Sequence, residues 1–376
     1  MYLHSLSYSK IYVAKILYLS HDMYKIGDII DEFTHRKKFP IIGLVWDIKR
    51  LLPWRITKDA YKIWISEIML QQTRVEAVIP YFERFITKLP TLEALAMVDD
   101  ETLYKLWEGL GYYRRARFLK EAAKVCMDTY NGRLPNTYKE LLTLPGVGMY
   151  TAAAIASIAF DQAVPAVDGN VLRVYARVHV CDFDIAKEKT KRFVFEELQQ
   201  EVDPNNPGDY NQAMMELGSQ VCIGNGTPRC NICPIASSCS AYKQGLQNSL
   251  PVKSKLKERR KQNHTILILR KDHMYYVHKR TKGILMEHMY EFMNIEHVLK
   301  KKEIEQLIDP MYGIVKIKKF TSHTHVYSHV EWNMQAYVID VKQIDDHFVS
   351  WQMIQEKLPM AGAMKKFIQE IEKETS

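Results

Sequence analysis

One glutamate on an otherwise apolar segment is the first residue whose setting suggests acid–base chemistry. Glu67 lies in a helix-prone apolar run, and helical spacing would place Gln71 and Arg74 on its face, four and seven positions later. The carboxylate either forms a salt bridge, with Arg74 or Arg55, or sits in a poorly solvated site that raises its pKa until it donates a proton. The residue pattern alone favours the salt bridge.

A second carboxylate stands in the segment VDGNV. Asp168 precedes a helix-prone run, where an aspartate most often only caps the helix. Upstream, the turn LPGVG at 144–148 ends one helix and opens another, whose free amides form an anion site without any side chain. Residues 144–177 are therefore either a helix-hairpin-helix that holds a nucleic-acid phosphate or a plain buried helix with a glycine turn.

Four of the six cysteines are crowded together, at intervening lengths of seven, two and five residues. Four thiols this close predict a tetrahedral zinc site or a cubane iron–sulfur cluster in a reducing compartment, and the spacing leaves both open. The four are Cys222, Cys230, Cys233 and Cys239. The other two, Cys126 and Cys181, lie apart and are expected in the core.

An aromatic and basic turn, GLGYYRRAR at 109–117, separates two expected helices. Tyrosines interleaved with arginines suit a nucleic-acid edge or a wedge into the base stack, and a solvated basic turn is the alternative. A net charge of +8 and a pI near 8.9 add a mild argument for a polyanionic partner.

The elements that position these residues change along the chain. Its 376 residues suffice for two or three domains, and no apolar run reaches the roughly 18–20 residues of a membrane span. Residues 1–38 are expected to be an extension of unknown role, or to reflect a start codon placed before the real start at Met23.

Helical patterns follow, including one long run to Leu89 that is eased at Pro80. A basic linker at 243–262 precedes a separate α+β domain. Its strands are expected at 264–270, 274–280, 313–320, 323–330 and 332–340, and its helices at 350–358 and 362–374.

In this order the motifs resemble the MutY-type adenine DNA glycosylases, which are helix-hairpin-helix, iron–sulfur enzymes of the endonuclease III superfamily. The resemblance covers about residues 40–370. It rests on LPWR (52–55), SEIMLQQT (66–73), GLGYY (109–113), LPGVGMYTA (144–152), VDGNV (167–171), NQAMMELG (211–218), the four cysteines and YSH (327–329). It implies a mainly α catalytic domain at 39–242 with an iron–sulfur loop at 222–239, and a C-terminal α+β Nudix-like domain at 263–376.

The resemblance also implies an activity, the removal of adenine mispaired with 8-oxoguanine or guanine in double-stranded DNA. Glu67 matches the acid that protonates adenine N7, and Asp168 matches the carboxylate that stabilises the sugar cation, as in the two-carboxylate logic of glycoside hydrolysis. Asn170 matches a residue that positions these carboxylates. Tyr150 stands where bifunctional relatives carry a lysine nucleophile, so no Schiff base can form at this position and a monofunctional enzyme is expected.

Further matches concern DNA, the cofactor and the cellular setting. Trp54, Arg55 and Gln212 match the pocket for the extruded base. Wedge and opposite-base contacts fall on Gln72, Thr73, Leu110 and Tyr112, phosphate contacts on Gly146 and Gly148, and lesion contacts on Ser328 and His329. The four cysteines would hold a [4Fe–4S] cluster. The expected protein is a monomer in the cytoplasm, associated with the nucleoid, with no membrane partner.

Three departures and two alternatives accompany this interpretation. The first cysteine interval is seven residues where the family usually has six, Tyr327 replaces a phenylalanine, and GILMEHMYEFMN lacks the usual tryptophan and proline. No intact Nudix box is present, so the last domain is expected to bind rather than hydrolyse. The alternatives are a bifunctional glycosylase/lyase acting on oxidised pyrimidines and a non-catalytic, metal-stabilised DNA-binding protein.

Overall fold

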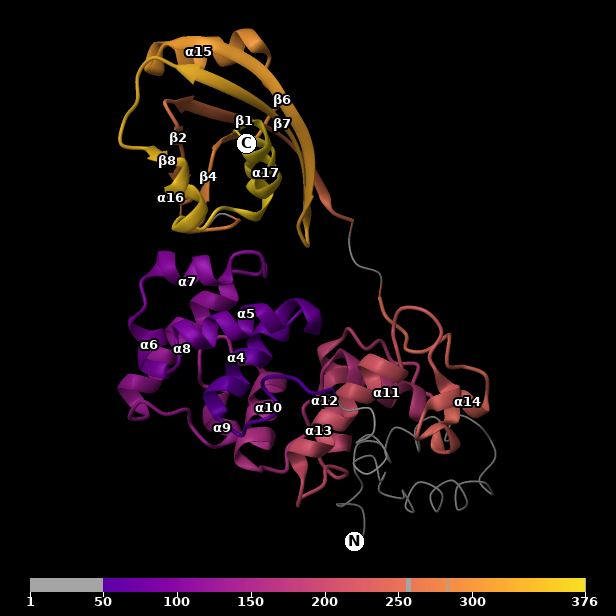
Figure 1. Cartoon of the computed structure of the whole chain (residues 1–376). Coiled ribbons are helices and arrows are strands. Elements are labelled where there is room, and N and C mark those ends of the chain that lie inside the picture. Colours follow the sequence, from indigo (N-terminus) through magenta and orange to yellow (C-terminus); the bar gives the residue numbers. More distant parts are fainter. Residues whose placement is uncertain (1–49, 255–257, 282, 284, 376) are drawn as a thin grey trace, which may run out of the picture.

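The computed structural model describes residues 50–254, 258–281, 283 and 285–375 and has two lobes, one helical and one α+β (Figure 1). The extension expected at 1–38 lies outside the described residues. The α+β lobe stands over α7 of the helical lobe. In the part of the chain described, no helix combines the length and apolar character needed to cross a membrane.

The helical lobe is built around two separate cores. Its α-helices are α4 (Ala60–Leu70), α5 (Val75–Lys88), α6 (Leu92–Met97), α7 (Asp100–Trp107), α8 (Arg114–Thr129), α9 (Tyr138–Leu141), α10 (Met149–Phe160), α11 (Gly169–Val178), α12 (Glu188–Leu198), α13 (Pro207–Glu216) and α14 (Ser240–Lys243). One core gathers α4 to α10 around the fully buried Trp64 and Trp107. The other gathers α11 to α13 with the cysteine segment.

Short polar side chains set where several of these helices begin. Asp59 caps α4 by accepting from the amides of Tyr61 and Lys62, and Asp99 caps α7 by accepting from that of Thr102. Between α9 and α10, Gly146 adopts φ +74°, a left-handed angle that a side chain would resist. The turn at 144–148 is therefore a helix-hairpin-helix turn that opens α10 at Met149.

The prediction of one long helical run, eased at Pro80, is wrong. α4 ends at Leu70 and α5 begins at Val75, while Pro80 lies inside α5. The break falls at Gln72, whose φ of 58° is left-handed and cannot continue a helix. The expected polar face is broken with it, since the exposed Arg74 belongs to the next helix.

The α+β lobe folds around one mixed sheet. Its strands are β1 (Arg260–Lys271), β2 (Met274–Tyr276), β3 (His278–Lys279), β4 (Tyr290–Glu291), β5 (Met293–Ile295), β6 (Ile314–Val326), β7 (Val330–Val341) and β8 (Phe348–Ser350). The sheet order is β6-β7-β1-β2-β8, with β5 also paired to β1 and with β3 and β4 forming a separate pair. β1 and β7 run parallel and the other pairs of the sheet antiparallel. The helices are α15 (Lys301–Tyr312), α16 (Trp351–Glu356) and α17 (Lys365–Thr375).

Two features of this lobe differ from the expectation. The segment at 323–330 is no strand of its own, because it spans the end of β6, a turn and the start of β7. The sequence pattern also missed α15, although Ile304, Ile308 and Tyr312 recur at helical spacing and are buried. The domain boundaries themselves stay predictions. The last helix before the linker ends at Lys243, and β1 begins at Arg260.

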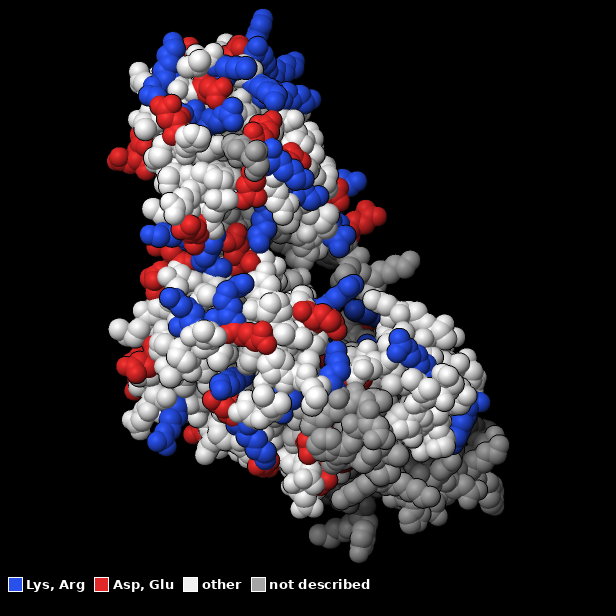
Figure 2. Space-filling model, viewed as in Figure 1, with Lys and Arg blue, Asp and Glu red and all other residues white. Residues whose placement is uncertain are grey.

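Polar contacts join the two lobes along α7 and the start of α8. Lys279 Nζ lies 2.9 Å from a carboxylate oxygen of Glu101, and Arg117 Nη1 lies 3.8 Å from one of Glu287. Tyr104 stacks on the ring of His288 at 5.7 Å. In Figure 2, acidic and basic side chains stand side by side at this level of the molecule. Apolar packing accompanies these polar contacts, because the core around Trp64 and Trp107 is continuous with buried residues of the α+β lobe such as Met364.

Gly146→Ala should destabilise the helical lobe, while Gly148→Ala serves as the matched control. A Cβ on Gly146 would lie 2.5 Å from Cβ of Phe118, whereas one on Gly148 meets nothing within 4 Å. The left-handed angle and the clash together predict a loss of about 2–4 kcal/mol for Gly146→Ala, against about 1 kcal/mol or less for Gly148→Ala. Urea unfolding followed by circular dichroism measures both, and equal losses would contradict the conformational argument.

Candidate active site

A cavity of about 1120 Å³, here called the inner cavity, opens between the two helical cores. Three elements bring chemistry to its wall. Glu67 comes from α4, Tyr150 from the first turn of α10, and Asp168 from the N-terminus of α11. The inner cavity thus joins residues that lie up to a hundred positions apart in the sequence.

Glu67 is buried, with 5% of its surface exposed, and its partner is a tyrosine. The Tyr150 hydroxyl donates a hydrogen bond of 2.6 Å to Oε2 of Glu67. Neither salt bridge considered from the sequence forms among the described residues, because Arg55 pairs with Glu216 instead. The carboxyl group therefore stands in a poorly solvated site without a neutralising ion pair.

This environment favours the protonated form of Glu67. Burial raises the pKa of Glu67, the hydrogen bond from Tyr150 and the charge of Arg55 oppose the rise in part, and the nearby Asp168 adds to it. Burial and the two carboxylates also raise the pKa of Tyr150 well above its ordinary value, so its hydroxyl stays a donor. Glu67 therefore suits the role of a general acid.

Asp168 occupies a different setting at a helix N-terminus. Its Oδ1 accepts from the amides of Asn170 and Val171 at 2.8 Å, and its Oδ2 accepts from Asn170 Nδ2 at 2.7 Å. Burial raises the pKa of Asp168, while these hydrogen bonds act in the opposite direction. The amide donors and the positive end of the helix dipole can hold an anion in this position.

Arg173 ties the Asp168 region to the cysteine segment. Its guanidinium donates to Oδ1 of Asn170 at 2.8 Å, to the carbonyl of Gly218 at 2.7 Å and to the carbonyl of Cys222 at 2.7 Å. Asn170 is thus oriented from both sides, by Arg173 and by the carboxylate that it binds. The sequence pattern did not single out Arg173.

The residues expected to hold an extruded base line the inner cavity together, and the structure adds a buried ion-pair group beside them. Trp54, Arg55 and Gln212 all lie in its wall. Glu216, 1% exposed, pairs with Arg55 and with Arg50. Burial acts to raise the pKa of Glu216, but the hydrogen bond from Arg50 and the charges of Arg55 and Arg50 outweigh it and lower that pKa. Sequence reasoning missed Glu216 and Arg50.

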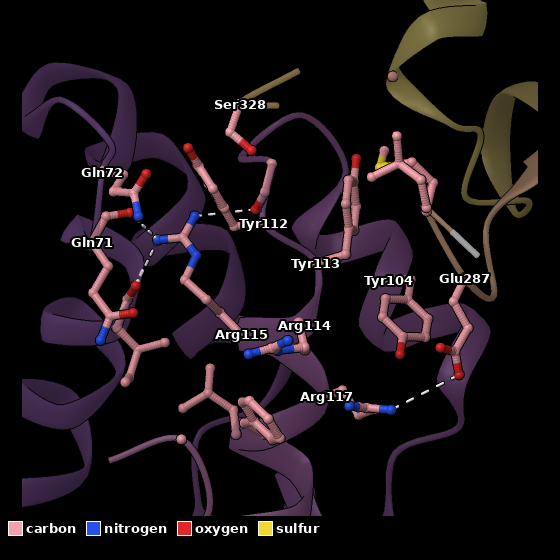
Figure 3. A pocket seen from close by; sticks show the side chains of 18 of the residues that line it. Gln71, Gln72, Tyr104, Tyr112, Tyr113, Arg114, Arg115, Arg117, Glu287 and Ser328 are labelled. Atoms are coloured by element: carbon pink, nitrogen blue, oxygen red, sulfur yellow. Dashed lines mark hydrogen bonds and ion pairs between the residues drawn. The ribbon is translucent and has the colours of Figure 1, made fainter. Parts of the chain in front are cut away.

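A second and larger cavity, of about 1430 Å³, lies between the two lobes and is here called the inter-lobe cavity. Gln72, Tyr112, Ser328 and His329 contribute to its wall, and Figure 3 shows Gln72, Tyr112 and Ser328 around the same space. Leu110 does not line it, because its side chain is buried in the helical core.

The inner and inter-lobe cavities share part of their walls. Gln72, Gly146 and Gly148 line both, while Thr73 lines only the inner one. With the exception of Leu110, the structure therefore brings the expected DNA-contact residues to two adjoining cavities.

The four clustered cysteines face one small cavity of about 20 Å³. Arg177 Nη1 lies 3.2 Å from Sγ of Cys222, and Sγ of Cys239 lies 3.6 Å from the carbonyl oxygen of Arg177. Within the described residues no three His, Cys, Asp or Glu side chains are already drawn together as a metal-binding group. The donor set nevertheless fits a thiolate-bound metal or cluster, since four thiols border one small cavity and a guanidinium lies beside one of them.

The comparisons with known proteins agree with this arrangement. Residues 65–200 match a model described as HhH-GPD superfamily base excision DNA repair protein, and residues 264–370 match one described as NUDIX domain. The adenine DNA glycosylase of Buchnera aphidicola (subsp. Schizaphis graminum) is 32% identical over 282 residues, which is 75% of this chain and 80% of that protein. The chain belongs to the adenine DNA glycosylase family.

Other adenine DNA glycosylases and one solved structure show a similar likeness. The rat adenine DNA glycosylase is 46% identical over 239 residues, covering 60% of this chain and 45% of the rat protein. The chain therefore spans less than half the length of that relative. The structure of a thermostable thymine-DNA glycosylase superposes with a TM-score of 0.50 at 30% identity, covering 54% of this chain and 94% of that one.

Glu67→Gln should make this family member more stable than the wild type at neutral and alkaline pH. Well below the ordinary glutamate pKa of 4.5, folded and unfolded wild-type chains both hold the proton, so the pH-linked difference is smallest. As the pH rises from this ordinary value to the raised pKa of folded Glu67, the unfolded chain loses its proton while the folded chain keeps it. The stability of the wild type therefore falls relative to the variant over this window and levels off above it.

Urea unfolding of both proteins at a series of pH values from 4 upward measures this effect. The exposed Glu93, on the surface of α6, supplies the control Glu93→Gln, whose effect should not grow with pH. A pH-independent difference between Glu67→Gln and the wild type would contradict a raised pKa.

Proposed function

We propose that the protein is a monofunctional DNA glycosylase that removes adenine mispaired with 8-oxoguanine or guanine. The observation that carries the proposal is the presence of two carboxyl groups in the wall of the inner cavity, close enough for the charge of one to affect the other. Glu67 is buried in a site that favours its protonated form, whereas Asp168 accepts hydrogen bonds from the amides at the start of α11. An acid opposite an anion is the arrangement that cleavage of a glycosidic bond requires.

In this mechanism the two groups act on opposite ends of the bond that breaks. Glu67 donates its proton to N7 of the extruded adenine, the N-glycosidic bond breaks, and adenine leaves with the bonding electrons. Asp168 stabilises the positive charge left on the sugar, while Asn170 fixes the orientation of its carboxylate. Water then adds to the sugar carbon and loses a proton to Glu67, which restores the acid and leaves an abasic site.

Tyr150 supports hydrolysis without strand cleavage. Its hydroxyl donates to Glu67 and is no amine, so no Schiff base forms at this position. Two lysines, Lys191 and Lys253, also line the inner cavity, and Lys191 lies 2.6 Å from a carboxylate oxygen of Glu188. Among the described residues that line this cavity, these are the lysines through which a lyase activity would act.

DNA binding would use both cavities. The target adenine enters the inner cavity after leaving the base stack, at a cost of about a few kcal/mol. The opposing strand lies in the inter-lobe cavity, where Ser328 and His329 of the α+β lobe face Tyr112 and Gln72 of the helical lobe. That lobe reads 8-oxoguanine without hydrolysing a nucleotide, and the protein acts as a monomer in the cytoplasm.

We further propose that Cys222, Cys230, Cys233 and Cys239 hold a [4Fe–4S] cluster. The position of all four cysteines around one small cavity supports it. The cluster would link the cysteine segment into one rigid loop by four iron–thiolate bonds. Arg177 contacts Cys222. Arg173 donates hydrogen bonds both to the Cys222 carbonyl and to Asn170, so it connects the cysteine segment to Asn170.

The activity is tested on a duplex that contains adenine opposite 8-oxoguanine, with and without alkali after incubation. We expect strand breaks only after alkali, since a monofunctional enzyme leaves an intact abasic strand. Glu67→Gln should reduce the single-turnover rate by about a thousandfold or more and leave duplex affinity within about threefold. Glu93→Gln should leave both unchanged.

Three results would contradict the assignment. Breaks without alkali would point to a lyase nucleophile such as Lys253. Full activity of Glu67→Gln would remove Glu67 from the chemistry. Duplex binding without excision by the wild type would favour the non-catalytic DNA-binding alternative.

Cys233→Ser should lose the bound cluster, with Cys181→Ser as its control. Cys181 is partly buried beside the same core but lies outside the four-cysteine set. Iron and acid-labile sulfide in the purified wild type and in Cys181→Ser should approach four of each per chain for a cubane cluster, and should fall strongly in Cys233→Ser. One zinc per wild-type chain, without sulfide, would replace the cluster by a zinc site.

A further inference from the structure

Arg115 is a buried arginine whose partners are almost all backbone carbonyls. It lies in the first turn of α8 and is 8% exposed. Burial lowers its pKa to about 10, so it keeps its charge at neutral pH. No carboxylate pairs with it among the described residues. A buried guanidinium of this kind must be matched by several acceptors at once.

The acceptors of Arg115 come from two segments that are far apart in the sequence. Nη1 donates to the carbonyls of Ile68, Met69 and Gln71 at 2.7, 2.9 and 2.6 Å. Nη2 donates to the carbonyls of Leu110 and Gly111 at 3.3 and 3.1 Å. The first set ends α4, where a positive charge meets unpaired carbonyls and the negative end of the helix dipole. A helix cap alone would not require the second set.

Each segment continues directly into a residue with a left-handed backbone. Gln72, which follows the Gln71 carbonyl, has φ 58°, and Tyr112, which follows the Gly111 carbonyl, has φ 49°. For residues other than glycine this conformation is strained, so surrounding contacts must hold it. Arg115 holds the peptide group immediately before each of the two residues.

Both left-handed residues point into the inter-lobe cavity. Tyr112 is 45% exposed and Gln72 is also exposed, so neither side chain is fixed by burial. Figure 3 shows the Arg115 guanidinium between the Gln71–Gln72 segment and Tyr112. The aromatic rings of Trp107 and Tyr112 lie 5.3 and 5.6 Å from its central carbon, which completes its enclosure.

We propose that Arg115 is a positioning residue that locks Gln72 and Tyr112 into one rigid wedge for extrusion of the target base. The inference rests on the proposed function, in which these two residues line the cavity that receives the opposing strand of the duplex. A wedge displaces a base pair only if its parts do not yield, and both parts here are exposed side chains on turns. Arg115 supplies the missing rigidity through their backbones, and does so without touching the reacting atoms.

The first test is hydrogen exchange of the full chain, wild type against Arg115→Lys, which keeps the charge but loses the planar fork. The amides of Gln71, Thr73 and Leu110 are protected by local carbonyls in the two segments. Their exchange should accelerate together in Arg115→Lys by about tenfold or more, while the amide of Val147 in the hairpin turn should not change. Unchanged exchange, or acceleration in one segment only, would overturn the coupling.

The second test separates extrusion from chemistry. Single-turnover excision is measured on adenine paired with 8-oxoguanine and on adenine with no base opposite, which needs little extrusion. Arg115→Lys should be slower by about tenfold or more on the paired substrate and within about threefold of wild type on the unpaired one. The exposed Arg133 provides the control Arg133→Lys, which should match the wild type on both.

Equal losses on the two substrates would show a general structural defect and overturn the wedge role. If the wild type excises adenine from neither substrate, the proposed function fails, while the exchange result still decides whether Arg115 joins the two segments.

Should Arg115→Lys fail to fold, the wild type itself gives the answer. In a spectrum of protein labelled with ¹⁵N-arginine, Arg115 can be assigned by its contacts with the Trp107 ring. Bound at both ends, it should show separate, slowly exchanging Nη signals. A single averaged Nη signal would mean a freely rotating guanidinium and would overturn the proposal.

Discussion

The electrostatics of the inner cavity depend on the burial of one carboxyl group without a counter-ion. Arg55, the nearest candidate partner of Glu67, is drawn away by Glu216, and a tyrosine hydroxyl takes its place. A hydroxyl stabilises the carboxylate less than a guanidinium would, so the balance stays with the neutral acid. Glu216 thus influences Glu67 indirectly. It binds Arg55, whose positive charge still acts on Glu67 but forms no ion pair with it.

Helix ends carry much of the remaining chemistry. Asp168 stands at the start of α11, Tyr150 in the first turn of α10, and Gln71 at the end of α4. Because unpaired amides and carbonyls gather at such ends, the backbone itself provides much of the polarity of the two cavities. This also explains why two separate hydrophobic cores are needed. Each core fixes a set of helices, and the inner cavity lies between them.

The sequence predicted which residues lie around the inner cavity better than it predicted the paths of the helices. The carboxylates, the hairpin glycines and the cysteines belong to motifs with fixed local spacing, and the structure brings the carboxylates together as expected. The choice between an acid and a salt bridge at Glu67 could not be made locally, because it depends on Glu216, far away in the chain. No glycine or proline marks the break after Leu70. Its left-handed residue is Gln72, and Arg115, from another helix, binds the carbonyl of the residue before it.

Some misses had a signal that could have been used. α15 carries buried residues at helical spacing, and the Glu303 side chain accepts from the amide of Lys300 at its start. Its interior Pro310 argued against a helix of that length. Leu110 is apolar and next to an exposed tyrosine, and no local pattern tells which of two neighbours in a turn is buried. The structure gives the position of Leu110, and the DNA contact expected of it stays a prediction.

The ion pairs that join the two lobes have a consequence for measurements of DNA affinity. Lys279 with Glu101 and Arg117 with Glu287 are partly exposed, so dissolved ions screen them as they screen contacts with phosphates. Added salt therefore weakens the docking of the lobes and the attraction to the duplex at the same time. The slope of log affinity against log salt concentration would then count charges within the protein as well as counterions released from DNA. A count of phosphate contacts taken from that slope alone would be in error.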